Sequence, residues 1–298
     1  MTGPVIAIHA GAATGASIVV EAEDRCRAAL LEALADGRAV LENGGDALSA
    51  VQAAVMVMED FELFNAGHGA TLCSDGSVEL SASLMASDRS AGAVAATKRT
   101  RNPIVGALAV LRSDQVLMIG EAADRRAADA GAEQVEPGYF ITERQRARLR
   151  AQLGGTDHAT VGAVCVDSHG RLAAATSTGG IRAQPPGRVG DSALLGAGTW
   201  ADAGVAVSCT GDGEAFIRAG VGRYIGALVE QGMTLAAACD HALAQVRELG
   251  GAGGLVAVDA RGAAALPFLT ALMPRGVWRA GDEPVAWVGE SAAASVAV

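Results

Sequence analysis

The sequence predicts an α+β fold in which two stacked β-sheets lie between outer layers of helices, a four-layer αββα sandwich. Two observations lead to this prediction. Strand-like and helix-like segments occur in both halves of the 298 residues. Many of the strands are apolar on both faces, which is typical of sheets that are covered on both sides. Because the sequence shows no internal repeat, we expect a single domain over residues 1–298.

The first half of the chain opens with a β-branched run at residues 5–8, which predicts a strand that ends in a small-residue turn, HAGAA. A helix is expected over about residues 21–43, because leucines recur on one face and an Asn-Gly-Gly sequence follows as a stop signal. Asp46 is suited to cap a second helix. The remaining elements expected in this half are a Gly-rich loop at 65–69, strands at 77–85 and 92–97, a helix from 102 to about 112, a strand at 115–119 and a helix to about 130.

Residues 131–159 differ in character from their surroundings. They contain a Pro-Gly pair, a basic stretch with a T-x-x-Q capping box at Thr142 and Gln145, and a Gly-Gly pair, which together predict a surface connector between the halves. Beyond it, apolar runs at 161–166 and 172–177 are joined by a turn sequence, which is a hairpin signal. The later elements expected are strands at 205–209, 255–258 and 284–288 and helices at about 214–229 and 235–249.

The composition favours a soluble protein that acts on small molecules. Half of the residues are hydrophobic but only 3% are aromatic, so small aliphatic side chains and the 39 glycines must build the core. A net charge of −10 disfavours nucleic acid and anionic membranes as partners. The sequence has no signal-peptide pattern and no membrane-spanning apolar run, which predicts a cytoplasmic protein. Five scattered cysteines without metal-binding spacing agree with a reducing compartment: Cys26, Cys73, Cys165, Cys209 and Cys239.

Three patterns fit known motifs only formally. GAGTWA at 196–201 matches a dinucleotide fingerprint, but a strand-like segment follows the glycines where a helix is required. ATSTG at 175–179 lacks the first glycine and the strand-turn-helix context of a nucleophile elbow. The five histidines have no metal-binding spacing. We therefore expect no dinucleotide site, no serine-hydrolase triad and no histidine metal site.

Hydroxyl groups and glycines are dense between Thr160 and Thr210, in the stretches TVGAV, TSTGG, GRVGD and SCTGDGE. Ordinary sheet threonines and turn glycines are one explanation. The other is a chemistry that uses these parts together. A threonine at a new N-terminus carries its own general base, an α-amine that titrates at about 7.7–8.0 in peptides. Thr210 and the backbone N–H of Gly211 are suited to hold an oxyanion, and Arg188 and Asp191 are suited to hold a zwitterion.

Eight motifs carry a family resemblance. TSTGG, GRVGDS, GAGTWAD and SCTGDGEAFIR lie within residues 160–218, and HAGAA, FNAGHGA, RNPI and GGAGGLVAVD lie elsewhere. With these motifs the chain resembles the type 2, or plant-type, L-asparaginases, which are also called isoaspartyl peptidases. The resemblance implies the αββα fold of N-terminal nucleophile hydrolases. It also implies a threonine enzyme that hydrolyses L-asparagine and β-aspartyl dipeptides without an organic cofactor, as a homodimer of cleaved units.

The resemblance further implies a role for each matching residue. Self-cleavage of the Ala159–Thr160 bond would expose Thr160 as the nucleophile and divide the chain into an alpha subunit, 1–159, and a beta subunit, 160–298. The other implied roles are a hydrogen bond between Thr178 and the nucleophile, substrate binding by Arg188, Asp191 and Gly213, an oxyanion hole at Thr210 and Gly211, and a position behind the nucleophile for Asn65. A structural sodium ion would be held by main-chain carbonyls of a loop that contains Met58, Glu59, Phe61, Phe64, Ala66 and His68.

The sequence departs from the family pattern at three places. HAGAA stands where the family commonly has HGGAG, Ala159 replaces a glycine before the nucleophile, and Ser81 and Ala86 stand where aspartate is common. The HAGAA and Ala159 departures motivate an alternative, an uncleaved and non-catalytic protein of the same fold that binds aspartate or asparagine. A glycosylasparaginase-like enzyme and a relative of the threonine proteases are two further alternatives.

Overall fold

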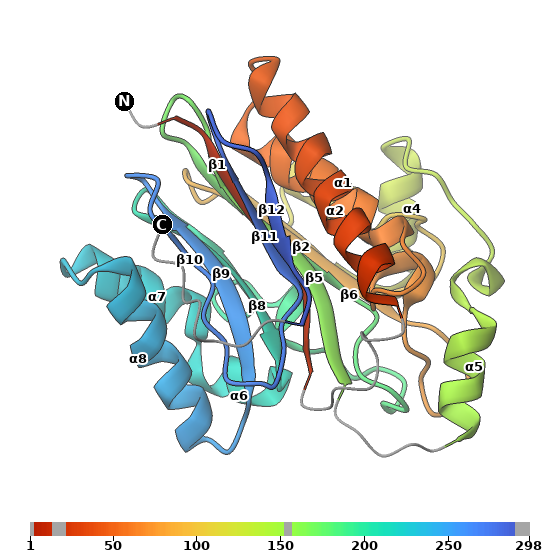
Figure 1. The fold of residues 1–298 in the computed structure, drawn as a ribbon. Helices are drawn as coiled ribbons and strands as arrows, with labels where there is room; N and C mark the ends of the chain where they lie inside the picture. The colour runs from red at the N-terminus through yellow and green to blue at the C-terminus, as the bar shows by residue number, and fades with distance from the viewer. Residues whose placement is uncertain (1–2, 14–21, 152–156, 290–298) are drawn as a thin grey trace.

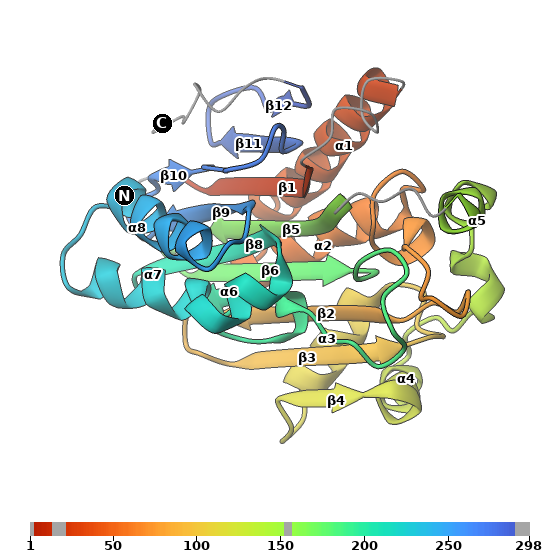
Figure 2. The ribbon, with the colours of Figure 1, turned by 90° about the horizontal axis from the view of Figure 1, so that it is seen from below.

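The computed structural model describes residues 3–13, 22–151 and 157–289, with the backbone alone at 157–159, and it contains two β-sheets (Figure 1). The larger sheet has the strand order β12-β11-β1-β5-β6-β2-β3-β4, which Figure 2 shows from one edge to the other. The smaller sheet has the order β10-β9-β8-β7. The strands are β1 (Val5–Ala13), β2 (Leu80–Ala86), β3 (Ala91–Thr97), β4 (Leu117–Ile119), β5 (Asp157–Val166), β6 (Leu172–Thr178), β7 (Thr199–Ala201), β8 (Val205–Gly211), β9 (Gly253–Asp259), β10 (Ala264–Ala265), β11 (Arg275–Arg279) and β12 (Val285–Trp287).

Helices cover the outer face of each sheet. The larger sheet is covered by α1 (Glu23–Glu42), α2 (Ala47–Asp60) and α3 (Pro103–Leu111), with α4 (Gly120–Asp129) beside α3. The smaller sheet is covered by α7 (Val221–Glu230) and α8 (Leu235–Glu248), and α6 (Gly213–Ala219) lies against α8. Figure 1 shows α8 and α7 on one outer side and α1 and α2 on the other, with both sheets between them. The predicted αββα sandwich is confirmed.

Small aliphatic side chains fill the space between the two sheets. This cluster includes Ala7, Val164 and Ala174 from the larger sheet and Ala206 and Val256 from the smaller one. Leucine, isoleucine and methionine are more prominent under α1, α2 and α3. Short side chains let two sheets approach closely. Hydroxyl groups on facing strands can therefore reach one another across the interface.

Two local signals in the sequence produce the predicted caps. The side chain of Asp46 accepts a 2.8 Å hydrogen bond from the Ser49 backbone N–H at the start of α2. Thr142 likewise accepts from the backbone of Gln145 at the start of α5 (Glu143–Arg150). The side chain of Gln145 does not complete the capping box, because it donates to the carbonyl of Gly69 instead. The connector is thereby attached to the Gly-rich loop, which ends in the short helix η2 (Gly67–Gly69).

The structure corrects four expectations about these elements. HAGAA is not a turn, because β1 continues through it to Ala13 with a bulge where Gly11 has φ 106°. β5 begins at Asp157, so Thr160 lies inside a strand. The helix expected at about 214–229 is two helices, divided at Gly220, which has a left-handed backbone. β11 was not expected, because its sequence, RGVWR, has little alternation.

Candidate active site

Thr160 lies on β5 with its hydroxyl against that of Thr178 on β6. Its residue surface is 7% exposed, and Oγ1 of Thr160 donates to Oγ1 of Thr178 over 3.1 Å. Thr178 also accepts a 3.0 Å bond from the backbone N–H of Gly180, which holds its hydroxyl in place. Antiparallel pairing of β5 and β6 brings the two threonines opposite each other. The structure therefore brings together the predicted nucleophile and its predicted hydroxyl partner.

The bulge in β1 lies opposite Thr160. In the described part of the chain, the ladder pairs between β1 and β5 pass from Ala12–His158 to Ala10–Val161, and those between β5 and β6 begin at Val161–Ser177. Thr160 therefore lies where both ladders are interrupted. Bulges are frequent beside active sites because they free the backbone from regular pairing. The HAGAA segment was expected as a turn, but it is the bulged end of β1 and lies beside Thr160.

Arg188, Asp191 and Gly213, the residues predicted to bind substrate, lie close together. A Cβ atom on Gly213 would lie 2.9 Å from Oδ1 of Asp191 and 3.0 Å from Nη2 of Arg188, so only glycine fits between them. Burial raises the pKa of Asp191 to about 7, although the positive charge of Arg188 lowers it. In the described part of the chain, Oδ2 of Asp191 is buried without a hydrogen-bond partner. Such an atom is suited to receive a cationic group from a ligand.

The guanidinium of Arg188 binds a carboxylate of the protein itself. Nε and Nη2 of Arg188 each donate a 2.9 Å hydrogen bond to the carboxylate of Glu214 on α6. The Arg188 side chain is 13% exposed and that of Glu214 is 61% exposed. This paired geometry is the one by which arginine recognises carboxylates. Glu214 therefore holds the position that a ligand carboxylate would take on Arg188.

Thr210 and Gly211 end β8. Oγ1 of Thr210 is buried and has no hydrogen-bond partner among the described residues. Gly211 has φ 145°, and a Cβ atom there would lie 2.4 Å from the carbonyl oxygen of Ala252, so a side chain does not fit. At the end of β8, the hydroxyl of Thr210, which is unpartnered in the described part of the chain, therefore lies next to the backbone of Gly211. The pair has the donor types that an oxyanion requires.

The sheet–sheet interface orients Thr210 toward the threonine pair. Oγ1 of Thr176 on β6 lies 2.7 Å from Oγ of Ser208 on β8. Side chains two residues apart share a face of a strand. Thr178 therefore lies on the same face as Thr176, and Thr210 on the same face as Ser208. The candidate nucleophile and the candidate oxyanion donor project into the same interface.

Asn65 lies behind Thr178 and bonds to the backbone around Gly180 and Thr71. Its side chain donates a 2.6 Å bond to the carbonyl of Gly180 and accepts a 2.7 Å bond from the backbone N–H of Thr71. Its own carbonyl accepts from Gly179. Asn65 therefore fixes the backbone that follows Thr178.

The segment predicted to bind sodium comprises the end of α2 and the loop after it, and backbone carbonyl oxygens gather in it. A Cβ atom on Gly67 would lie 2.4 Å from the carbonyl oxygen of Glu59, and one on Gly69 would lie 2.0 Å from that of Phe64. Carbonyl oxygens thus gather around the two glycines, and such groups suit alkali and alkaline-earth ions. The other members of the predicted set, Met58, Phe61, Ala66 and His68, belong to α2 or to the loop that leads from it. This arrangement fits a cation held by backbone carbonyls.

The buried carboxyl of Glu59 makes the stability of the folded protein depend on pH. Burial raises the pKa of its carboxyl to about 8, although hydrogen bonds from Ser177 and Ile104 lower it. The folded state therefore keeps a proton that the unfolded chain releases near pH 4.5. This contribution to stability is complete below pH 4.5 and is lost as the pH rises toward 8.

We expect Glu59→Gln to flatten the dependence of unfolding free energy on pH between 5 and 8.5. The slope removed is at most about 1.4 kcal/mol per pH unit. Two other groups also contribute in this range: the raised pKa of Asp191 adds a slope of the same sign, and the lowered pKa of His9 adds a slope of opposite sign below about pH 6.5. Urea denaturation at several pH values measures the slope of unfolding free energy against pH. Glu121→Gln, which changes an exposed carboxylate on α4, is the control. An unchanged slope in Glu59→Gln would contradict the assignment.

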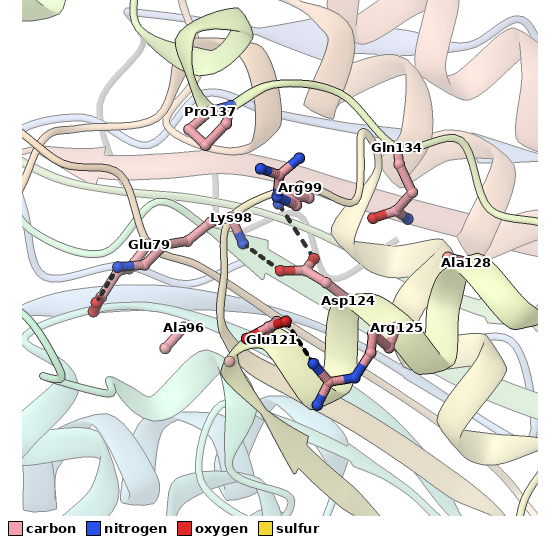
Figure 3. Close-up of a pocket in the computed structure, with 11 residues that line it drawn as sticks. Glu79, Ala96, Lys98, Arg99, Glu121, Asp124, Arg125, Ala128, Gln134 and Pro137 are labelled. Carbon is pink, nitrogen blue, oxygen red and sulfur yellow. Dashed lines mark hydrogen bonds and ion pairs between the residues drawn. The ribbon is translucent and has the colours of Figure 1, made fainter.

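A charged cleft of about 720 Å³ lies away from these residues, between β3, α4 and the following segment (Figure 3). Its charges compensate one another. Lys98 pairs with Glu79, and Arg125 pairs with Glu121. The buried carboxylate of Asp124 accepts from backbone N–H groups, as Figure 3 shows for Lys98 and Arg99. Because the cleft contains none of the predicted site residues, we place the candidate active site at Thr160.

Three residues of this region were missed by sequence reasoning. His9 donates from Nδ1 to the carbonyl of Thr160 over 3.0 Å, Ser208 contacts His9, and Glu214 pairs with Arg188. His9 and Ser208 lie in the motifs HAGAA and SCTGDGEAFIR, but the local sequence does not show that His9 meets Thr160 and Ser208, because these contacts span 151 and 199 residues. Glu214 had one signal, since it follows directly after the predicted contact Gly213.

The asparaginase family model matches residues 2–286 of the chain. The chain belongs to this family. This asparaginase-family chain is 45% identical to the isoaspartyl peptidase of Salmonella typhimurium, over 95% of its own length and 98% of that relative. It is 45% identical to the isoaspartyl peptidase of Escherichia coli, over 94% of each chain. It is 38% identical to the isoaspartyl peptidase/L-asparaginase of Bos taurus, over 91% of its own length and 92% of that relative.

The family match agrees with the fold, since N-terminal nucleophile hydrolases have the four-layer αββα arrangement that the sequence predicted and the structure shows. The members named above are hydrolases by their names. Within residues 3–13, 22–151 and 157–289, none of the helices of this asparaginase-family chain combines the length and apolar character needed to cross a bilayer.

Proposed function

We propose that this protein is a self-processing threonine amidohydrolase that cleaves β-aspartyl dipeptides and hydrolyses L-asparagine to L-aspartate and ammonia. One observation supports it most strongly. Asp191 and Thr210, both nearly or fully buried, each keep one polar atom without a partner in the described part of the chain. These are the two side chains expected to meet a ligand ammonium and an oxyanion. The names of the relatives, isoaspartyl peptidase and L-asparaginase, support the substrate class.

Processing would precede catalysis. Oγ1 of Thr160 attacks the carbonyl carbon of residue 159, the acyl group passes from nitrogen to oxygen, and water hydrolyses the resulting ester. The products are the subunits 1–159 and 160–298, with a free amine on Thr160. The bulge of β1 opposite Thr160 supports this step, because among the described residues the ladder pairs of β1 and β6 with β5 pass over Thr160.

Hydrolysis would then use the amine and hydroxyl of Thr160 together. The amine takes the proton of Oγ1, which attacks the side-chain amide or isopeptide carbonyl of the substrate. The hydroxyl of Thr210 and the backbone N–H of Gly211 stabilise the oxyanion, a contribution of about 3–4 kcal/mol for one such donor. Ammonia or an amino acid leaves with a proton from the amine, and water releases aspartate from the acyl-enzyme.

Substrate selection follows from the charges of the site. The α-carboxylate of the aspartyl group displaces Glu214 from Arg188, and its α-ammonium pairs with Asp191, while Gly213 leaves room for both contacts. A zwitterionic aspartyl group is thus recognised at both charges, which a neutral amide would not be. Asn65 supports this site indirectly, through the backbone after Thr178.

We expect Glu214→Gln to lower KM for L-asparagine by about 3- to 10-fold, because the substrate no longer competes with a charged carboxylate for Arg188. The negative charge of Glu214 also raises the pKa of Asp191. Asp191 must be ionised to bind an ammonium, so kcat/KM should rise with pH through about 7 in the natural protein. In Glu214→Gln this rise should move to lower pH.

Steady-state kinetics across pH 5–9 measures both effects. Glu230→Gln removes another exposed carboxylate that pairs with an arginine, and it should leave both quantities unchanged. Suppose instead that Glu214→Gln raises KM and leaves the pH at which kcat/KM rises unchanged. Glu214 would then orient Arg188 and would not compete with substrate.

Three further properties belong to the proposal. The loop after α2 binds a structural sodium ion through main-chain carbonyls, which the oxygens gathered at Gly67 and Gly69 support. The active form is a homodimer of cleaved units, as the family resemblance implies. The protein works in the cytoplasm, and the free buried thiols of the described residues support a reducing compartment.

The deciding experiment is mass spectrometry of the purified protein, combined with an assay of aspartate release from L-asparagine and a β-aspartyl dipeptide. We expect a new N-terminus at Thr160 and release of aspartate from both. An intact chain that binds aspartate without turnover, and does so equally as Thr160→Ala, would instead support the non-catalytic alternative. Activity on a glycosylated asparagine would support the glycosylasparaginase-like alternative.

A further inference from the structure

Five polar side chains form a continuous hydrogen-bonded chain in the interface between the two sheets. His9, Ser208, Thr176, Thr199 and Ser83 come from β1, β8, β6, β7 and β2, and each of them is 0% exposed. The distances along the chain are 3.0 Å from Nε2 of His9 to Ser208, 2.7 Å from Ser208 to Thr176, 2.6 Å from Thr176 to Thr199 and 2.7 Å from Thr199 to Ser83. None of these five residues is assigned a role in the reaction proposed above.

The chain ends on two backbone carbonyls of the site. Nδ1 of His9 lies 3.0 Å from the carbonyl oxygen of Thr160. At the other end, Oγ of Ser83 donates to the carbonyl of Ser192, next to Asp191, over 2.7 Å. The chain therefore connects the strand that carries the candidate nucleophile with the segment that carries the candidate ammonium contact.

The protons at the His9 end of this chain can be placed in only one way. The carbonyl of Thr160 can only accept, so Nδ1 of His9 carries a proton. Burial lowers the pKa of His9 to about 3, so the ring is neutral and Nε2 is an acceptor. Ser208 must then donate its single proton to His9. It follows that Thr176 donates to Ser208. At the other end, Ser83 gives its single proton to the carbonyl of Ser192 and has none left for Thr199. His9 therefore fixes the directions only as far as Thr176.

The bond from His9 matters at Thr160, because among the described residues the strand pairs of β5 pass over this position. The pairs on the β1 side pass around the bulge at Gly11, and those on the β6 side begin at Val161. Self-cleavage would also remove the covalent link on its amino side. The bond from His9 is then a restraint on the peptide unit that follows the reactive hydroxyl.

The neighbouring strand leaves space for the link between His9 and Ser208. A Cβ atom on Gly162 would lie 2.0 Å from Oγ of Ser208 and 2.4 Å from Nε2 of His9. Even alanine at 162 would therefore separate the two side chains. Gly162, two residues after Thr160, is a second and independent feature that accommodates this contact.

We propose that His9 is a positioning residue for Thr160, and that Ser208 holds His9 in the tautomer that donates to the Thr160 carbonyl. This inference rests on the proposed function of Thr160. Without the hydroxyl of Ser208, the proton of His9 is free to move to Nε2. The Thr160 carbonyl then loses its donor, although neither of the two residues touches the substrate.

The first test compares Ser208→Ala with Ser83→Ala. Both variants remove one wholly buried hydroxyl from the same chain, but only Ser208 contacts His9. We expect Ser208→Ala to slow self-cleavage at least tenfold and to lower kcat with KM within twofold of the natural value. Ser83→Ala should cleave within twofold of the natural rate. Equal cleavage rates in the two variants, at equal melting temperatures, would overturn the proposal.

A second pair of variants separates the two nitrogens of His9. In His9→Asn the amide nitrogen takes the place of Nδ1 and keeps the donor to Thr160, whereas in His9→Gln it takes the place of Nε2. We expect His9→Asn to cleave at least tenfold faster than His9→Gln. The reverse order would overturn the proposal, and this comparison decides the matter if Ser208→Ala does not fold.

Nitrogen NMR of histidine-labelled protein reads the tautomer directly, independently of activity. We expect the proton on Nδ1 in the Thr160→Ala protein, which does not process itself, and loss of this state when Ser208→Ala is added. A proton on Nε2 in the parent protein would overturn the inference alone. A natural protein that never cleaves would overturn the proposed function, and the role of His9 with it, whatever the spectrum shows.

Discussion

Thr160→Ala should abolish both self-cleavage and hydrolysis. The variant removes the hydroxyl that attacks in both steps, so we expect an intact chain and a loss of kcat/KM of more than about 10³-fold. The fold should persist, because among the described residues the hydrogen bond of Oγ1 of Thr160 is the one to Thr178, and alanine leaves little space unfilled. Mass spectrometry, aspartate release and a melting curve measure the three quantities.

Thr160→Ser is the matched control for this prediction. Serine keeps the hydroxyl and, after cleavage, the amine, and it loses only the methyl group that restricts χ1. We expect it to process itself and to retain activity within about tenfold of the natural protein. Undiminished aspartate release by Thr160→Ala would exclude Thr160 as the nucleophile and would move the search to another hydroxyl of the site.

Arg188→Gln should raise KM for L-asparagine by about 10²-fold or more. The guanidinium offers two parallel hydrogen bonds to a carboxylate in a largely buried position, as its present bonds to Glu214 demonstrate, and loss of such a partner costs about 2–5 kcal/mol. Self-cleavage should proceed normally, because Arg188 binds the substrate and not the scissile bond. This separation of processing from binding distinguishes Arg188 from Thr160.

Arg223→Gln controls for the loss of a positive charge. Arg223 lies on α7 and pairs with Glu230, and its side chain is 46% exposed, so we expect KM within twofold of the natural value. If Arg188→Gln bound L-asparagine normally, the α-carboxylate would have to be recognised by another cation. If it failed to cleave, Arg188 would have a role in folding or processing that its contacts do not suggest.

Local sequence determined a large part of this protein. Asp46 and Thr142 cap the helices at which they were expected, and the hairpin of β5 and β6 follows from two apolar runs and a turn. Arg188 and Asp191 were also identified from their residue types, as a charge pair within one contiguous motif. Thr178 was identified from the family resemblance of its motif. These features depend on neighbours within a few residues, which a single sequence displays directly.

Tertiary structure alone decided how these groups are held. The bulge at Gly11 faces Thr160 only because β1 pairs with β5, some 150 residues away. The hydrogen bonds of His9 to Thr160 and Ser208 span 151 and 199 residues, and they exist because two sheets pack closely over small side chains. Register and sheet packing are set by contacts distant in sequence, so the local pattern around His9 does not contain them. The sequence by itself determined which groups can react, and the packing of the sheets decided which of them meet.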